Sequence, residues 1–339
     1  MTTNLPMAHH GIHAPSTAAP ARGWRATASA VALACGVLVA GGLPQGAEAR
    51  EGVQVEQPSA LSRLVPAEQL EAAAAQQYAQ MIQQARAQNA LLPDSHPQVQ
   101  RLRSIAERII PHAQPWNKRA RQWQWQVILL RSNELNAFCM PGGKIAFYTG
   151  ILEQLKLTDD EVAMIMGHEV AHALREHARE RLAKQSATRI GVNVISGLFG
   201  LGSVGDAVLS MGGQLLNLTF SRQDESEADL VGMELAARAG YDPRAGVTLW
   251  QKMTAANKGA PPQWLSTHPS GTNRIKEIQA NLPKVMPLYD RAGKPPQRFD
   301  QPLRFGQDYY GQMEPLAYWG RAGVTGGTAI GLHHHGHAH

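Results

Sequence analysis

The centre of the sequence reads Met166-Gly167-His168-Glu169-Val170-Ala171-His172, an HExxH pattern in a stretch that predicts one helix from about Thr158 to about Ser186. Four residues turn a helix by about 400°, so His168 and His172 fall on one face, one turn apart. Two imidazoles in this position can hold one zinc ion. Glu169 points to the side of the pair, where its carboxylate can accept a proton from water bound to that ion.

An acidic cluster further along the chain, Glu225-Ser226-Glu227-Ala228-Asp229, supplies what the histidine pair lacks. Glu225 and Asp229 share a helix face, so Glu225 can bind the metal while Asp229 reaches the outer nitrogen of a liganding histidine. Glu227 is turned about 200° from Glu225 and is expected to face elsewhere. Such a cluster alone is usually a solvated helix face. Paired with HExxH, it predicts a His-His-Glu site with the open fourth position of a catalytic zinc.

This ligand set implies peptide hydrolysis by activated water, with no acyl-enzyme. Glu169 is expected to accept the water proton and deliver it to the leaving amine. The oxyanion that develops needs a donor besides zinc, and the best candidates are His268, in Ser266-Thr267-His268-Pro269, and Arg274. For His268 the alternative, a loop histidine with satisfied hydrogen bonds, stays open.

Composition narrows the class of protein. The 339 residues are 43% hydrophobic, enough for one large core or two small ones. The formal net charge is +5, but lysine and arginine are scattered without a basic run or interleaved aromatic residues. Nucleic-acid binding is therefore not expected.

Residues 1–49 have the pattern of an export signal. Arg22 and Arg25 precede the apolar stretch Ala26–Leu43, and Ala47-Glu48-Ala49 is a small-x-small cleavage site. We expect export to the periplasm and cleavage after Ala49, with two alternatives: an uncleaved membrane anchor, or lipidation at Cys35. Cleavage would leave Cys139 without a disulfide partner, and a buried apolar role is expected for it.

The remaining pattern is mostly helical. Residues 50–65 are expected to be a linker, residues 66–90 a helix, and Asp94 or Ser95 the cap of a second helix. Two strand-like segments, 123–131 and 144–149, predict a hairpin or small sheet directly before the HExxH helix. Thr158 followed by Glu161 is a capping-box signature for that helix. Further helices are expected over about 222–240, 243–256 and 272–281.

Two segments are less regular. Residues 189–218 are apolar and rich in glycine, and predict two short helices that cover the cleft or touch a membrane surface, with an ordinary core hairpin as the alternative. Residues 283–339 are expected to form an extended or disordered, Pro/Gly-rich tail. Five of the last seven residues are histidine, a cluster that can bind metal loosely.

Four motifs occur in an order that resembles metallopeptidase family 48. They are HEVAH at 168–172, SRQDESEADLVG at 221–232, AGYDP at 239–243 and STHPSGTNRI at 266–275. Asn136-Ala137-Phe138 with Pro141-Gly142-Gly143 also resembles the family's strand before the active-site helix. The resemblance covers about residues 66–282. The family includes periplasmic and mitochondrial quality-control endopeptidases.

The resemblance implies an α+β, mostly α fold: a zincin-like domain with a small β-sheet beside the HExxH helix. It assigns one zinc ion to His168, His172 and Glu225, general base catalysis to Glu169, and ligand orientation to Asp229. It also places His268 and Arg274 at the site, with His268 able to cover the metal in a resting state. An extended substrate is expected to lie against the strand near Lys144 to Tyr148.

We therefore predict an exported zinc metalloendopeptidase that acts on misfolded or unassembled envelope proteins. The alternative is a chaperone-like or adaptor protein whose zinc site is closed by His268 and which binds clients without cutting them. Intact Glu169 favours the enzyme, because a site that only binds does not need it.

Overall fold

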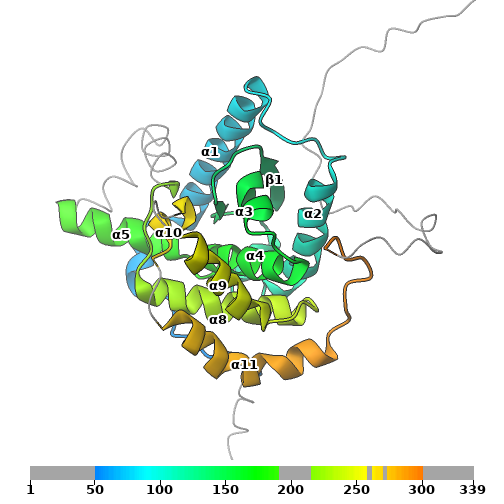
Figure 1. Ribbon diagram of the computed structural model, residues 1–339. Helices are drawn as coiled ribbons and strands as arrows, with labels where there is room; N and C mark the ends of the chain where they lie inside the picture. The colour runs from blue at the N-terminus through cyan, green and yellow to red at the C-terminus, as the bar shows by residue number, and fades with distance from the viewer. Residues whose placement is uncertain (1–49, 191–214, 258–261, 270–272, 301–339) are drawn as a thin grey trace, which may run out of the picture. The chain divides into compact units, whose positions relative to one another are not determined.

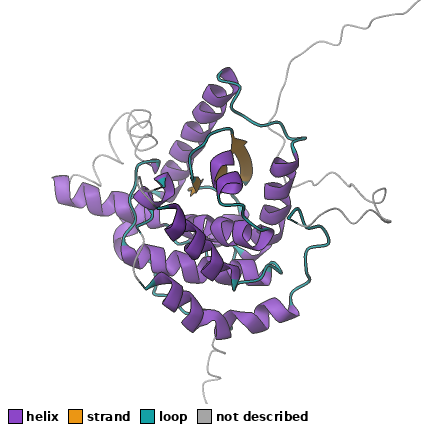
Figure 2. Cartoon of the chain, in the orientation of Figure 1, coloured by secondary structure: helices purple, strands orange, loops and turns teal. Residues whose placement is uncertain are grey.

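The computed structural model describes residues 50–190, 215–257, 262–269 and 273–300, with backbone only for residues 186–190 (Figure 1). The predicted signal segment with Cys35, most of the glycine-rich segment and residues 301–339 of the predicted tail lie outside these residues. Figure 2 shows that the described part is mainly helical with one small sheet, which confirms the predicted fold class. No helix among the described residues is both long and apolar enough to cross a membrane.

The helices and strands, in chain order, are α1 (Ala67–Ala87), α2 (Pro97–Ile109), β1 (Gln126–Leu130), β2 (Ala137–Met140), β3 (Lys144–Tyr148), α3 (Thr149–Gln154), α4 (Asp159–Leu174), α5 (His177–Ile190), α8 (Arg222–Arg238), α9 (Ala245–Ala256), α10 (Gln263–Thr267) and α11 (Arg274–Arg291). Short 3-10 helices cover Ala60–Leu64, Ile110–His112 and Lys118–Arg121. The cap of α2 is His96, one residue beyond the predicted pair, because Pro97 takes the first helical position.

Helix α4, which carries HExxH, lies in the middle of the domain, and α2, α8, α9 and β2 pack around it (Figure 1). Every residue of α4 except Asp160 is buried. The predicted capping box is present, since Thr158 accepts from the Glu161 backbone and the Glu161 side chain accepts from the Thr158 backbone. Because α4 is enclosed on all sides, its functional side chains are held in a rigid environment.

The single long helix predicted over 158–186 is wrong: α4 ends at Leu174 and α5 begins at His177. Glu176 adopts a φ of 57°, in the left-handed region that breaks a helix. The side-chain amide of Asn117 donates to the carbonyl of Leu174 at 3.0 Å and so satisfies a carbonyl exposed at the break. The sequence has no glycine or proline at this point, so the break depends on tertiary contacts.

The sheet has the strand order β1-β3-β2, with β1 parallel and β2 antiparallel to β3. The hairpin is therefore formed by β2 and β3 rather than by the two predicted strands. Gly142 and Gly143 in its turn have φ of 86° and 78°, and a Cβ at Gly143 would lie 2.6 Å from the Trp125 ring. Since β3 is paired on both sides, the expectation that substrate adds to Lys144–Tyr148 is wrong.

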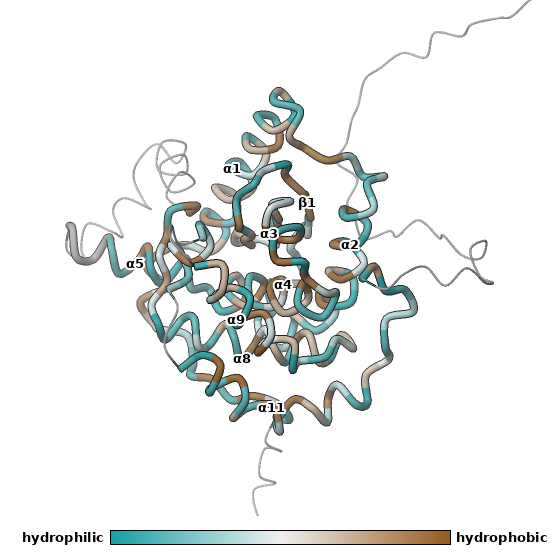
Figure 3. Tube along the Cα trace, in the orientation of Figure 1, coloured by the Kyte–Doolittle hydropathy of each residue, from teal (hydrophilic) through white to brown (hydrophobic). Residues whose placement is uncertain are grey.

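The sheet lies between α1 and α4. On one face, the Tyr78 hydroxyl of α1 donates to the Ile145 carbonyl at 2.6 Å, and Ala74, Met140 and Ala146 pack beside it. On the other face, Cys139 and Phe147 join the main core with the residues of α4. Figure 3 shows the mixed hydropathy along α1 that this one-sided burial requires.

Helices α4 and α8 cross at a pair of glycines. A Cβ on Gly167 would lie 2.5 Å from the Gly232 carbonyl oxygen, and a Cβ on Gly232 would lie 2.5 Å from the His168 nitrogen. Only glycine at both positions allows this approach of the two backbones. The acidic cluster one to two turns earlier on α8 is thereby brought against the histidines of α4.

Both ends of the described part are more ordered than predicted. α11 continues through Pro283 and Pro287 to Arg291, because Val285 and Leu288 are buried in the core and offset the lost backbone hydrogen bonds. Residues 50–65, expected to be a linker, include a 3-10 helix. Arg50 also pairs with Glu234, a fully buried carboxylate on α8.

Candidate metal centre

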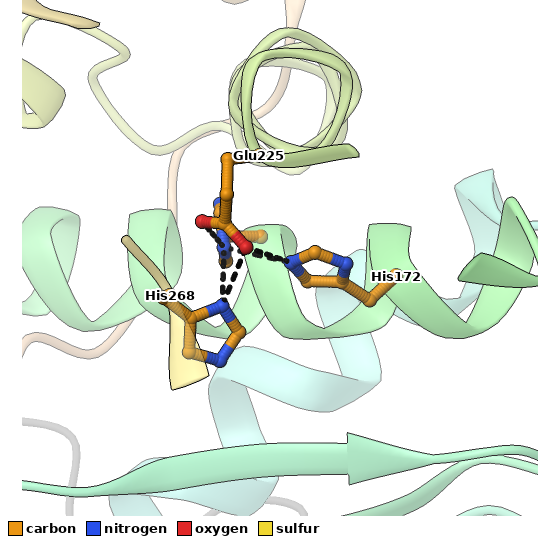
Figure 4. A group of neighbouring side chains, drawn as sticks. His172, Glu225 and His268 are labelled. Atoms are coloured by element: carbon orange, nitrogen blue, oxygen red, sulfur yellow. Dashed lines mark hydrogen bonds and ion pairs between the residues drawn. The ribbon is translucent and has the colours of Figure 1, made fainter. Parts of the chain in front are cut away.

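Three side chains from α4 and α8 converge on one point. The Nε2 atoms of His168 and His172 are 3.0 Å apart, and the Glu225 carboxylate lies 3.4 Å from the first and 3.3 Å from the second. Figure 4 shows Glu225 reaching from α8 toward His172 on α4. All three residues are at most 3% exposed. The sequence thus predicted a set of side chains that the fold does bring together.

Asp229 and Arg274 lie behind these three residues. Asp229 Oδ1 is 2.9 Å from Nδ1 of His168. Arg274 donates to both oxygens of Asp229, at 2.6 Å each, and to Glu225 at 2.8 Å. The Trp250 ring stacks on its guanidinium at 3.8 Å. Arg274 thus donates to carboxylates from Nε, Nη1 and Nη2, and its predicted role as a donor to the oxyanion stays a prediction.

The residues present fit a metal ion. His168 Nδ1 is opposite the Asp229 carboxylate and therefore carries a proton. His172 Nδ1 is engaged by His177 at 2.9 Å. The two Nε2 atoms lie 3.0 Å apart beside a carboxylate, so without a cation one proton must lie between them; a cation bound by all three residues would take the place of that proton.

The pKa values of His168, His172 and Glu225 also indicate that the site fits a metal ion. Burial alone would lower the pKa of His168, but Glu225 and Asp229 outweigh it and raise this pKa to about 9. Burial holds the pKa of His172 well below its usual value. Burial opposes ionisation of Glu225, yet the neighbouring histidines bring its pKa well below the usual range. Without a metal, His168 is therefore protonated and His172 neutral, and a divalent ion would replace the His168 proton as the positive charge between them.

Glu169 lies beside the cluster and not within it. Its Oε1 accepts a hydrogen bond from the Trp264 indole at 2.6 Å and lies 3.5 Å from His268 Nε2. Burial raises the pKa of Glu169, and the histidines and the indole offset this only in part. A carboxylate with a raised pKa is a better proton acceptor for general base catalysis.

His268 lies against the same centre. Its Nδ1 is 3.0 Å from Glu225 Oε1 and 3.3 Å from His168 Nε2, and the residue is 2% exposed (Figure 4). Within the described part of the chain, the ligand atoms of His168, His172, Glu225 and His268 all lie within 4.8 Å of one another. His268 is thus in position to occupy the fourth side of the ion.

Three neighbours of the site were missed from the sequence. Trp264 donates to Glu169 and stacks on His268 with ring centres 4.7 Å apart. Phe220 stacks on His172 at 4.0 Å, and His177 contacts the same imidazole from the side. Trp264 is four residues before His268, and His177 is five after His172. These short spacings were the available signals, but neither specifies a contact without the fold.

The fold and site define a zincin-type domain, in which an HExxH helix and a glutamate from a second helix form a metal centre. The profile of peptidase family M48 matches residues 96–282, more than half of the chain. The chain belongs to this family of zinc metallopeptidases.

Similar proteins include the mitochondrial metalloendopeptidase OMA1 of Arabidopsis thaliana, 41% identical over 159 residues, which are 47% of this chain and 32% of that protein. The protein of the same name from Schizosaccharomyces pombe is 34% identical over 198 residues, 58% of this chain and 56% of its own length. The beta-barrel assembly-enhancing protease of Escherichia coli is 25% identical over 199 residues, 56% of this chain and 40% of its own. The chain therefore spans about a third to just over half of these relatives.

Proposed function

We propose that this protein is a zinc-dependent metalloendopeptidase that cuts misfolded or unassembled proteins of the cell envelope. The observation that carries the proposal is the convergence of His168, His172 and Glu225 with Glu169 immediately beside them. Three protein ligands leave a fourth position on zinc, as catalytic zinc sites require. A site for structure alone would not need the adjacent buried base.

Bound by these three residues, zinc would polarise the scissile carbonyl and lower the pKa of water. The residues of the chain do the rest. Glu169 takes the proton from the attacking water and gives it to the leaving amine. Trp264 holds the Glu169 carboxylate through the 2.6 Å hydrogen bond. Arg274 holds Asp229 and Glu225 in place, and Asp229 in turn fixes the tautomer of His168.

The substrate in this proposal lies along the outer edge of β2, since β3 is paired on both sides. Tyr148 N donates to Asn136 O at 3.1 Å, so Asn136 directs its backbone groups toward β3. Successive residues of a strand direct these groups to opposite edges, so Cys139, three residues further on, directs its N–H and C=O to the outer edge of β2. Burial raises the pKa of the Cys139 thiol, and the nearby Glu169 charge raises it further. An extended peptide at this edge would thus pass beside the base.

Envelope substrates and periplasmic location are supported by two features. The E. coli relative is named for beta-barrel assembly, and residues 1–49 have the pattern of an export signal. Other relatives are named as mitochondrial, and membrane contact through residues 189–218 stays a prediction. The chemical class of substrate is the same in each setting: an extended or unfolded polypeptide.

Cleavage of unfolded casein by wild type and Glu169→Gln, with zinc content measured in both, tests the proposal. The amide keeps an oxygen that can accept from Trp264, so the variant removes the base with little change in packing. Glu153→Gln, an exposed acid on α3, is the matched control. We expect about one zinc in each protein and activity in all but Glu169→Gln. The proposal is refuted if neither wild type nor His268→Ala cleaves casein when loaded with zinc.

The second candidate function is a client-binding protein with a closed zinc site. It is favoured by the position of His268, whose Nδ1 lies among the ligand atoms. It differs from the first proposal in the His268→Ala result. Opening the fourth position should raise the rate of casein cleavage if the protein is a peptidase that His268 restrains. If the protein only binds clients, cleavage should stay absent while casein binding is retained.

A further inference from the structure

The two liganding histidines have different partners at their outer nitrogens. Nδ1 of His168 faces the Asp229 carboxylate at 2.9 Å, whereas Nδ1 of His172 faces Nδ1 of His177 at 2.9 Å. His177 is 2% exposed and begins α5 directly after the break at Glu176. The break therefore returns the chain so that a third histidine lies beside the second ligand.

The proton positions follow from geometry. Nε2 of His172 faces the metal point, so its lone pair is there and its proton is on Nδ1. That proton is donated to His177, so Nδ1 of His177 must be the acceptor and its own proton must be on Nε2. The chain of hydrogen bonds thus works only if His177 holds one particular tautomer.

Glu227 is in position to select that tautomer. Its Oε2 lies 3.7 Å from Nε2 of His177, a buried nitrogen without a hydrogen-bond partner within 3.5 Å. Its Oε1 accepts from Arg175, which is 7% exposed and also donates to the Glu56 carbonyl. The carboxylate is thereby kept charged and aimed at His177, where it favours a proton on Nε2.

We infer that His177 and Glu227 are positioning residues that orient His172 toward the metal. Glu227 fixes the tautomer of His177, His177 accepts the Nδ1 proton of His172, and the Nε2 lone pair of His172 is left for the metal. Glu227, expected from helical spacing to face away from the site, acts on it through two side chains. The inference rests on the proposed zinc site and extends it with a second outer partner.

Zinc affinity, measured by competition with a chromophoric chelator, is the main test. His177→Ala should weaken zinc binding by about 10–100-fold, the usual effect of losing an outer-shell partner. His177→Asn keeps an acceptor near the position of Nδ1 and should restore most of the affinity. Glu180→Gln, on the same helix as His177 but paired with Lys184, is the control and should bind zinc as wild type does.

A double-mutant cycle separates positioning from packing. Glu227→Gln should weaken zinc binding in the wild-type background but not in His177→Asn, because an amide has no tautomer to select. The cobalt-substituted proteins should show shifted absorption bands in His177→Ala and wild-type bands in His177→Asn. Metal-free forms of all variants should unfold at similar temperatures, which a purely structural role would not allow.

The inference is overturned if His177→Ala binds zinc as tightly as wild type, or if Glu227→Gln has the same effect in both backgrounds. The second comparison uses Glu227→Gln and His177→Asn but not His177→Ala, so it tests the inference even if His177→Ala fails to fold. Casein cleavage by wild type, abolished in Glu169→Gln, tests the proposed function separately. Either result can therefore fail while the other holds.

Discussion

Replacing Gly232 by alanine should move the ligands of the metal centre apart, although Gly232 itself contacts no metal. The added Cβ would lie 2.5 Å from the His168 nitrogen and 2.6 Å from the Gly167 carbonyl carbon, whereas ordinary contact begins at 3.4 Å. Both atoms belong to backbone in the buried α4 and cannot turn aside. Helix α8 must therefore move away by about 0.9 Å, the difference between the observed and ordinary distances.

This displacement is large compared with what the site tolerates. Zinc–ligand distances are fixed to within about 0.2 Å, so a carboxylate withdrawn by about 0.9 Å no longer binds as a full ligand. The 2.9 Å contact between Asp229 and His168 would also exceed hydrogen-bond distance. We expect zinc affinity to fall by more than about 100-fold, since the change acts on a ligand and not only on its partner.

Stability should fall as well. Overpacking costs about 1–3 kcal/mol and alanine in a helix regains about 1 kcal/mol over glycine, so the free energy of unfolding should drop by up to about 2 kcal/mol. Chelator competition and urea unfolding measure the two effects. The control is Gly246→Ala in α9, whose Cβ would lie 3.0 Å from the flexible end of Met164 and in ordinary contact, at 3.5 Å, with the Ile278 side chain. The reasoning is refuted if Gly232→Ala keeps wild-type zinc affinity.

Three further predictions concern single side chains. Glu225→Ala should leave the protein without zinc at micromolar metal, whereas Glu227→Ala should still load one ion, more weakly; equal loss, measured as bound zinc after gel filtration, would contradict the ligand assignment. Trp264→Phe removes a hydrogen bond to the charged Glu169, worth about 1.5–3 kcal/mol, and should lower kcat about tenfold or more with zinc content unchanged. Burial, aided by two arginines, lowers the pKa of His112 below 6.5. Its contribution to stability is thus present above pH about 6.5 and lost as pH falls through the lower folded value, a slope that His112→Gln should flatten in urea unfolding of the metal-free protein.

Local sequence patterns predicted much of the fold. The capping box at Thr158, the helices around residues 70, 100, 230 and 250, and the mostly helical class follow from residue spacing, because helical periodicity and caps are set by neighbours within four residues. The metal site could also be anticipated: i and i+4 spacing on each helix defines which side chains share a face. The family assignment follows from the order of the same motifs.

What the sequence by itself determined was thus the identity of the metal-facing residues and the helices that carry them. Only the tertiary structure decided which strand keeps a free edge, where the HExxH helix stops, and what stands behind each ligand. These depend on contacts between residues far apart in the chain: the pairing of β3 with both β1 and β2, the Gly167–Gly232 crossing, and the fold of α5 that brings His177 to His172. Short-range spacing contains no information about such contacts, because they are fixed by how the helices and the sheet pack together.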